Sequence, residues 1–188
     1  MSKYIKQYSN VLDKTEIDTI LSERIKIYKE SGNPDLLINK STEDDFWFNV
    51  INRLDKKVKP IVQDYLNLVS LNSKLSKFLE LNHIGFLYNY DGMFTEPHYD
   101  TELVIYNKEI IVKPLIVLLH LSEDYEGGEL MFPHENFVCK KESGSIVVFP
   151  TGYSFPHFST PVLKGEKHLC RLTYKVNSEY YETDIMEI

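Results

Sequence analysis

The spacing of hydrophobic residues changes near residue 80. Before that point, apolar residues recur three and four positions apart, which is the spacing of one face of an α-helix. The first helix is predicted to begin after Asp13, because Glu16 follows three positions later as in a capping box. A second helix is predicted from Ser41 onward, with a kink or a new turn at Pro60.

Beyond residue 80, the chain consists of short segments rich in aromatic and β-branched residues, separated by Gly, Pro, Asn and Asp. Such segments predict strands, and many short strands with turns between them predict a sandwich or a barrel. Helices followed by strands predict an α+β fold with the helices packed on one face of the sheet. We therefore expect one domain over residues 1–188, with helical support in 1–79, a strand core in 80–176 and a tail in 177–188.

The composition of the 188 residues is that of an ordinary globular protein, with 43% hydrophobic and 26% charged residues. The net charge of −7 disfavours a nucleic-acid partner, because an acidic surface repels a phosphate backbone. Cys139 and Cys170 form no C-x-x-C motif and no disulfide framework, so we expect buried free thiols in a reducing compartment. Neither a secretory signal nor an apolar run near the roughly 20 residues of a membrane span is evident. A soluble, cytoplasmic protein without a membrane partner is expected, and its oligomeric state is left open.

The stretch EPHYDTE contains two candidate metal ligands, His98 and Asp100. Residues two apart in a strand point to the same face, but such a pair also arises by chance in an acidic chain. A third ligand has to come from elsewhere. His157 is the candidate, because it follows an apolar strand and opens the string HFSTPVLKGEK. On its own, it could equally be a polar residue in a loop.

Four motifs stand in order along the second half of the chain: YNYDGMFTEPHYD, LLHLSEDYEGGELMFP, SGSIVVFP and HFSTPVLKGEKHLCRLTY. Over roughly residues 80–176 they resemble the prolyl 4-hydroxylase-like family of iron(II)- and 2-oxoglutarate-dependent dioxygenases. The resemblance implies a double-stranded β-helix, or jelly-roll, core. It also implies that His98, Asp100 and His157 hold Fe(II) as a facial triad, which leaves three coordination positions open.

The resemblance further implies that 2-oxoglutarate fills two open positions and O2 the third, with ascorbate as a candidate additional reductant. The far carboxylate of 2-oxoglutarate needs a buried cation, and Lys167, ten residues after His157, matches the family's basic position. In a strand, Lys167, Leu169 and Arg171 share a face. Arg171 departs from the family pattern, which has a small or polar residue there. It could bind the same carboxylate, pair with an acidic substrate or form a surface ion pair.

Two more positions match the family's co-substrate pocket. Tyr88 lies ten residues before His98, where relatives carry a tyrosine, and Tyr90 on the same face is its rival. His120 occupies a strand position where relatives have a tyrosine that contacts the co-substrate. Aromatic core packing is the alternative for the tyrosines, and a buried core histidine is the alternative for His120.

The activity implied by the resemblance is hydroxylation of an unactivated C–H bond with release of succinate and CO2. A prolyl residue in a peptide or protein is the expected substrate, and a free amino acid or another small molecule is the alternative. Two other classes stay open: a cupin-like metal-binding jelly roll without oxygenase activity, and an inactive interaction module. The first would not need Lys167, and the second would not need all three metal ligands.

Overall fold

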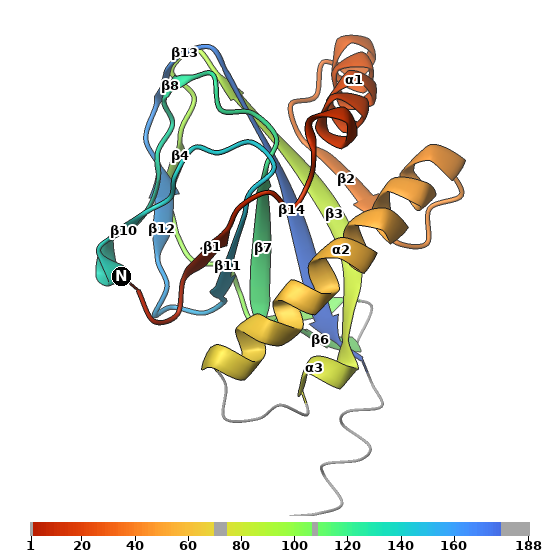
Figure 1. Cartoon of the computed structure of the whole chain (residues 1–188), viewed down its shortest axis with the longest axis vertical. Coiled ribbons are helices and arrows are strands. Elements are labelled where there is room, and N and C mark those ends of the chain that lie inside the picture. The colour runs from red at the N-terminus through yellow and green to blue at the C-terminus, as the bar shows by residue number, and fades with distance from the viewer. Residues whose placement is uncertain (1, 70–74, 107–108, 178–188) are drawn as a thin grey trace, which may run out of the picture.

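The computed structural model describes residues 2–69, 75–106 and 109–177. This part of the chain contains two long helices and a series of short strands (Figure 1). The helical segments are α1 (Lys14–Ser31), α2 (Asp45–Val69), the short α3 (Leu75–Phe78) and a 3₁₀ turn at Pro133–Glu135.

The strands form two facing sheets and two smaller pairs. The larger sheet has six strands, each antiparallel to its neighbours, in the order β1 (Lys6–Tyr8), β11 (Ile146–Pro150), β7 (Leu115–His120), β14 (Glu166–Val176), β3 (Leu79–Tyr90) and β2 (Leu36–Asn39). The smaller sheet has four, in the order β10 (Phe137–Val138), β9 (Leu130–Phe132), β12 (His157–Ser159) and β4 (Thr95–His98). The two pairs are β13 (Val162–Lys164) with β8 (Glu126–Gly127), and the hairpin of β5 (Leu103–Tyr106) with β6 (Glu109–Val112). Two facing antiparallel sheets with helices on one outer face confirm the predicted α+β jelly roll.

Two hydrophobic cores hold these layers together. The larger core lies between the helices α1 and α2 and one face of the six-stranded sheet, and Figure 1 shows α2 running across that sheet. The smaller core fills the space between the two sheets and includes Phe132. Side chains of strand β7 point alternately into the two cores: Val117 and Leu119 belong to the larger core, and Ile116 and Leu118 belong to the smaller core.

The N-terminal part of the chain is less uniformly helical than the spacing predicts. The capping box is present: the carboxylate of Asp13 accepts the N–H of Glu16 at 2.9 Å, and the carboxylate of Glu16 accepts the N–H of Asp13 at 3.0 Å. Two short strands, β1 and β2, also lie in this part and pair with β11 and β3. Short edge strands of this kind give little periodic signal, because their hydrogen bonds go to partners far away in the sequence.

The second helix begins later than predicted and is not ended by its proline. Helix α2 begins at Asp45 rather than at Ser41, and the carboxylate of Asp44 accepts the N–H of Trp47 at 3.0 Å. Aspartate at this position satisfies a backbone donor that the first turn of the helix leaves free. The helix continues through Pro60, held by the buried face that it packs on the sheet.

Three further expectations concern the cysteines, the membrane and the tail. Cys139 and Cys170 are both buried and free, as predicted. None of the helices in the described residues has the length and apolar character that crossing a membrane requires. The predicted tail falls almost entirely on residues 178–188, which lie outside the described residues.

The central strand β14 decides which side chains reach the space between the sheets. It pairs with β3 on one side and with β7 on the other. Cys170 and Leu172 belong to the core under the helices, whereas Lys167, Leu169 and Arg171 line a pocket on the opposite face. The alternation predicted from the sequence is therefore the one observed.

Candidate metal centre

Three side chains from two chain segments meet between the sheets. His98 is the last residue of β4 and lies directly across from His157, the first residue of β12. Asp100 follows two residues after β4 ends. In the part of the chain that the structure describes, this is the one group of three potential ligand residues whose donor atoms lie within 4.8 Å of one another. The three residues singled out in the sequence are thus brought together.

The spacing of the three donors fits one face of an octahedral metal ion. Nε2 of His157 lies 3.5 Å from Oδ2 of Asp100, and the ring centres of His98 and His157 are 4.3 Å apart. Two ligands that each lie about 2.1 Å from an ion and meet at a right angle are about 3 Å apart. Two imidazoles and one carboxylate are the donor set of non-haem Fe(II) facial triads, so the residues fit such an ion.

Both histidines are held so that the same ring nitrogen faces the centre. Nδ1 of His98 lies 2.8 Å from the carbonyl oxygen of Glu96, and Nδ1 of His157 lies 3.1 Å from the carbonyl oxygen of Phe155. A carbonyl only accepts, so each Nδ1 carries the proton and donates it. This fixes the tautomer and leaves both Nε2 atoms with a free lone pair for a metal.

The centre is closed on one side and open on the other. His157 is buried, with the rings of Phe132 and Phe149 at centroid distances of 5.2 and 4.9 Å. Burial lowers the pKa of His157, although the hydrogen bond to the Phe155 carbonyl and the charge of Asp100 act in the opposite direction. A lowered pKa keeps the imidazole neutral, which is the form that binds metal. His98 is exposed and Asp100 is half-buried, so solvent and ligands reach the centre from their side.

A pocket extends from the triad into the jelly roll. Its cavity measures about 60 Å³ and communicates with solvent. Besides the triad, its walls are formed by Leu87, Asn89, Thr95, Leu118, Leu130, Phe158, Ser159, Lys167, Leu169 and Arg171. Apolar walls with a few polar groups are typical of a small-molecule site.

A buried lysine without a counter-charge stands at the inner end of this pocket. Lys167 is 1% exposed, and its Nζ donates to the hydroxyl of Ser159 at 2.6 Å and to the carbonyl of Gly128 at 2.8 Å. No carboxylate of the described residues forms an ion pair with it. Burial lowers the pKa of Lys167 to about 8. An ammonium group has three donors, so one remains free for an anion, which would also relieve the cost of burying the charge.

Gly128 and Ser159 are the two residues that accept hydrogen bonds from Lys167. Gly128 has φ of +66°, and a Cβ atom there would lie 3.2 Å from Cδ of Lys167, so glycine is needed at this turn. The sequence predicts the turn. Ser159 was not predicted as a site residue, although a signal exists: it lies two residues after His157, on the same face of a strand.

Positive charge also surrounds the outer side of the triad. Nη1 of Arg171 lies 3.6 Å from Oδ1 of Asp100, the oxygen opposite the one that faces His157. Burial lowers the pKa of the nearby Lys113, the negative charge of Asp100 raises it, and the positive charge of Arg171 lowers it. Lys113 was not predicted, because no sequence spacing relates it to the triad. The surface ion pair weighed for Arg171 is thus a pair with a candidate metal ligand.

The structure corrects the placement of the two tyrosines. Tyr88 lies on the face of β3 that is turned away from the pocket, whereas Leu87 and Asn89 line it. Its ring stacks on that of His168 at 4.6 Å between centroids. Tyr90 lies on the same outer face, with its ring centre 4.8 Å from that of Tyr88. Neither tyrosine therefore reaches the triad pocket, and aromatic packing is their observed role.

His120 is also placed differently from the prediction. It is 1% exposed on β7 and is not among the pocket-lining residues, and neither ring nitrogen has a hydrogen-bond partner among the described residues. Burial, together with the nearby charge of Lys167, lowers the pKa of His120 to about 4. The ring is thus a neutral core histidine close to Lys167, which is the alternative weighed for it.

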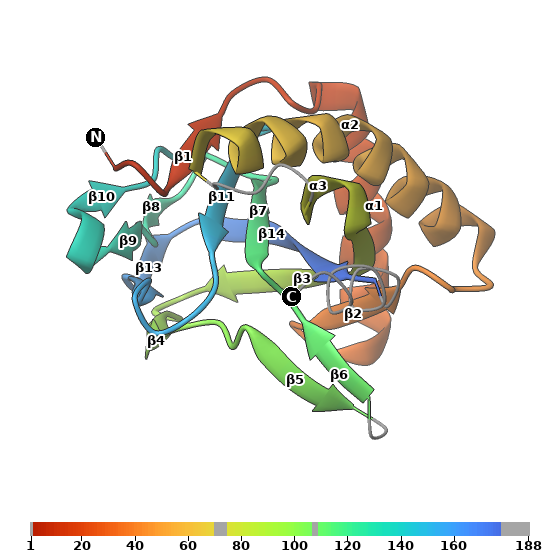
Figure 2. The same cartoon turned by 90° about the horizontal axis from the view of Figure 1, so that it is seen from below.

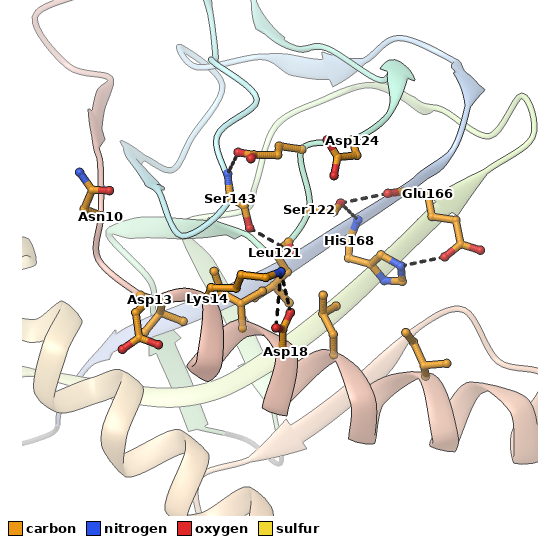
Figure 3. A pocket seen from close by; sticks show the side chains of 15 residues that line it. Asn10, Asp13, Lys14, Asp18, Leu121, Ser122, Asp124, Ser143, Glu166 and His168 are labelled. Atoms are coloured by element: carbon orange, nitrogen blue, oxygen red, sulfur yellow. Dashed lines mark hydrogen bonds and ion pairs between the residues drawn. The ribbon is translucent and has the colours of Figure 1, made fainter.

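A larger cavity lies elsewhere and lacks comparable chemistry. It measures about 650 Å³ and lies between α1, the loops that precede β8 and β11, and the start of β14 (Figure 3). Acidic side chains such as Asp13, Asp18 and Glu166 line it, and their donor atoms do not converge on a common point. His168 at its wall is paired with Glu166 at 3.3 Å. The small pocket at the triad is therefore the candidate site.

Comparisons with known proteins bear on the fold. No protein-family model and no curated protein sequence matches the chain. Solved structures do match. A viral collagen prolyl hydroxylase from Paramecium Bursaria Chlorella virus-1, in complex with 2-oxoglutarate, superposes with a TM-score of 0.71 at 17% identity, covering 94% of this chain and 97% of the other.

Two further solved structures share the fold. A prolyl hydroxylase from Trichoplax adhaerens, bound to a peptide fragment of the hypoxia inducible factor, gives a TM-score of 0.69 at 14% identity over 96% of this chain and 87% of its own. HygX from Streptomyces hygroscopicus with iron bound gives a TM-score of 0.65 at 12% identity, and the match covers 94% of this chain and 84% of HygX. At these identities the likeness concerns the fold, so the chain has the jelly-roll fold of these 2-oxoglutarate- and iron-binding proteins.

Proposed function

We propose that the protein is an Fe(II)- and 2-oxoglutarate-dependent dioxygenase that hydroxylates an unactivated C–H bond. The observation that carries this proposal is one pocket with a two-histidine, one-carboxylate triad at its mouth and an uncompensated buried lysine at its inner end. A facial triad leaves coordination positions for a chelating co-substrate and for O2. The lysine supplies the cation that the far end of a dicarboxylate needs.

Each residue has a defined task in this proposal. His98, Asp100 and His157 would hold Fe(II), which together with 2-oxoglutarate and O2 supplies the oxidising power for C–H hydroxylation, with release of succinate and CO2. Lys167 would bind and orient the far carboxylate of the co-substrate through its free third donor. Leu118 and Leu169 would exclude water from the space between the lysine and the triad.

A prolyl residue in a peptide or protein is the substrate class that we propose first. Two of the proteins that share the fold are named as prolyl hydroxylases, and one of them is bound to a peptide. The β5–β6 hairpin begins three residues after Asp100 and extends away from the body of the molecule (Figure 2). Leu103, Ile105 and Ile110 share one face of it and are 51%, 73% and 61% exposed. An exposed apolar face beside the centre suits a peptide chain.

The buried lysine also separates this proposal from a jelly roll with a different metal chemistry. A metal site that binds only water and a neutral ligand has no use for a cation at the end of its pocket. Keeping Lys167 buried without a carboxylate carries an energetic cost, which a bound dianion would offset. An inactive interaction module would not require the triad either.

The direct test is iron-dependent conversion of 2-oxoglutarate to succinate by the purified protein without added substrate. We expect slow succinate formation in the presence of Fe(II), O2 and ascorbate, and loss of it in His98→Ala, Asp100→Ala and His157→Ala. The matched control is His134→Ala, which removes an exposed histidine away from the triad. Absence of both succinate formation and 2-oxoglutarate binding in the unmodified protein would rule out the proposed activity.

A further inference from the structure

We infer that the substrate of this site carries a carboxylate near the carbon that is hydroxylated, either in the same residue or in the next one, and that Arg171 and Lys113 bind it. This inference rests on the proposed function and narrows its substrate class. Three features support it. Charged groups lie at both ends of the pocket, the positive charges of Arg171 and Lys113 would stay uncompensated beside a loaded centre, and both cations have unused hydrogen-bond donors.

The charged groups occupy opposite ends of the pocket. Lys167 contacts Ser159 at the inner end, whereas Arg171 lies beside Asp100 at the outer end. The two cations lie four positions apart on β14, which corresponds to about 13 Å between their Cα atoms. A co-substrate held by the metal and Lys167 would occupy the inner part. Arg171 would then face the outer side, where a second molecule would enter.

The charges of a loaded centre balance without the outer cations. A divalent ion, the carboxylate of Asp100, the two negative charges of 2-oxoglutarate and the ammonium of Lys167 carry no net charge together, with both histidines neutral. Arg171 and Lys113 remain as additional positive charges beside it. The negative group nearest to both is Asp100, whose charge is already shared with the metal. A substrate carboxylate would supply the missing charge.

The two cations also have donors to offer. Nε of Arg171 is buried and has no hydrogen-bond partner among the described residues, and the guanidinium faces the small residue Gly85 across the sheet. Lys113 forms no ion pair within the part of the chain that the structure describes. Its backbone is fixed, because its N–H donates to the backbone carbonyl of Glu102 at 2.7 Å and its own carbonyl accepts from the Thr151 hydroxyl at 2.6 Å.

These backbone bonds place Lys113 beside the centre. The carbonyl of Asp100 accepts the N–H of Gly152 at 2.8 Å. The backbone of Lys113 is hydrogen-bonded both to the carbonyl of Glu102 and to the hydroxyl of Thr151. Three segments distant in sequence are thereby joined around the outer side of the triad. Arg171 on β14 and Lys113 in the β6–β7 connection thus lie on the same side of Asp100, and an Arg and a Lys so placed are suited to bind a carboxylate through charge-assisted hydrogen bonds.

The test compares probes that differ only in the presence of the carboxylate. Three pairs cover the three sources of such a group: free L-proline against L-prolinamide, an acetylated peptide ending in a free proline against its amide, and an acetylated Pro-Glu peptide amide against its Pro-Gln counterpart. Gain of one oxygen atom is followed by mass spectrometry, and KM is compared within each pair. We expect the acid of at least one pair to have a KM about 10- to 100-fold lower than its neutral partner.

The variants are Lys113→Gln and Arg171→Gln, with Lys14→Gln as the matched control because Lys14 is highly exposed on α1. The KM ratio within a pair should fall to about threefold or less in both variants and stay unchanged in the control. Using this ratio cancels any loss of turnover that affects both probes. If Arg171 only positions Asp100, its variant will slow both probes equally and leave the ratio intact.

Two outcomes separate this inference from the proposed activity. Substrate-free succinate formation, together with equal use of acid and neutral probes or with no binding of any acid probe, would overturn the carboxylate site and leave the dioxygenase proposal standing. No succinate formation and no 2-oxoglutarate binding by the unmodified protein would overturn both. A ratio that survives in Lys113→Gln and in Arg171→Gln would also contradict the assignment of these residues.

Discussion

The Nζ atom of Lys167 donates a hydrogen bond of 2.6 Å to the hydroxyl of Ser159, two residues along the strand from the candidate ligand His157. Strand β14 thereby connects the inner end of the pocket with the strand that carries the metal ligand. The contact leaves one ammonium donor unused in a residue that is 1% exposed.

Replacing Lys167 by methionine should abolish the binding of 2-oxoglutarate while leaving metal binding intact. The variant keeps most of the length of the side chain and removes the charge-assisted bonds, so the affinity for 2-oxoglutarate should fall about 100-fold or more. Isothermal titration calorimetry in the presence of metal measures both affinities. Ser159→Ala should lower the affinity for 2-oxoglutarate by about three- to tenfold, because the ammonium group loses one neutral hydrogen-bond partner.

The control for these variants is Lys164→Met, which removes a lysine that is 77% exposed on β13 and paired with Glu126 on the surface. It should bind 2-oxoglutarate as the unmodified protein does. If Lys167→Met retains the co-substrate and Arg171→Gln loses it, the far carboxylate is bound at the outer end of the pocket instead.

The affinity for 2-oxoglutarate should depend on pH with a midpoint near 8. Burial lowers the pKa of Lys167 to about 8 in the free protein, and only the charged ammonium binds a carboxylate. Below this pH the affinity should be constant, and above it the affinity should fall about tenfold per pH unit, with one proton taken up on binding. Calorimetry in two buffers of different ionisation enthalpy measures that proton. In Lys167→Arg the guanidinium stays charged, so this fall should disappear.

The two candidate metal-ligand histidines should differ in their effect on stability. His157 is buried against Phe132 and Phe149, so His157→Ala should lower the free energy of unfolding by about 1–3 kcal/mol. His98 is exposed, and His98→Ala should change it by less than about 0.5 kcal/mol. Urea unfolding with a chelator present gives both values. An equal loss of unfolding free energy in His157→Ala and His98→Ala would show that His157 is less enclosed than the structure indicates.

Acid should destabilise the protein partly through His120. Its pKa is lowered to about 4 in the folded state by burial, against about 6.5 when unfolded. The unfolded chain therefore binds the proton first, so the stabilisation present above pH 6.5 is lost as the pH falls toward 4. By pH 5 this loss should reach about 2 kcal/mol.

The matching experiment measures urea unfolding between pH 7 and pH 4.5 for His120→Leu and for the exposed-site control His134→Ala. His120→Leu should flatten the pH dependence, and the control should leave it unchanged. Because His120→Leu also removes two buried ring nitrogens without partners, it should not lower stability at pH 7 by more than about 1 kcal/mol. An unchanged acid dependence would show that His120 is protonated at an ordinary pH.

The sequence by itself determined the parts of the site that depend on local spacing. Lys167 and Arg171 lie four apart on one strand, so the period of two places them on a common face. His98 and Asp100 lie only two apart at the end of β4, which keeps their side chains close together. The capping box at Asp13 depends equally on nearest neighbours and was present as predicted. The order of the motifs likewise indicated the jelly roll.

Only the tertiary structure decided which segments share the pocket. Counting ten residues back from His98 to Tyr88 crosses the turn between β3 and β4, and a turn does not preserve the alternation of a strand. The faces of β3 were therefore set by its register with β14, which pairs Tyr88 with His168 on the outer side. The approach of Lys113 to Asp100 depends in the same way on bonds between chain segments that lie far apart in the sequence. Such contacts leave no periodic pattern in the chain, because each is made only when the sheets close.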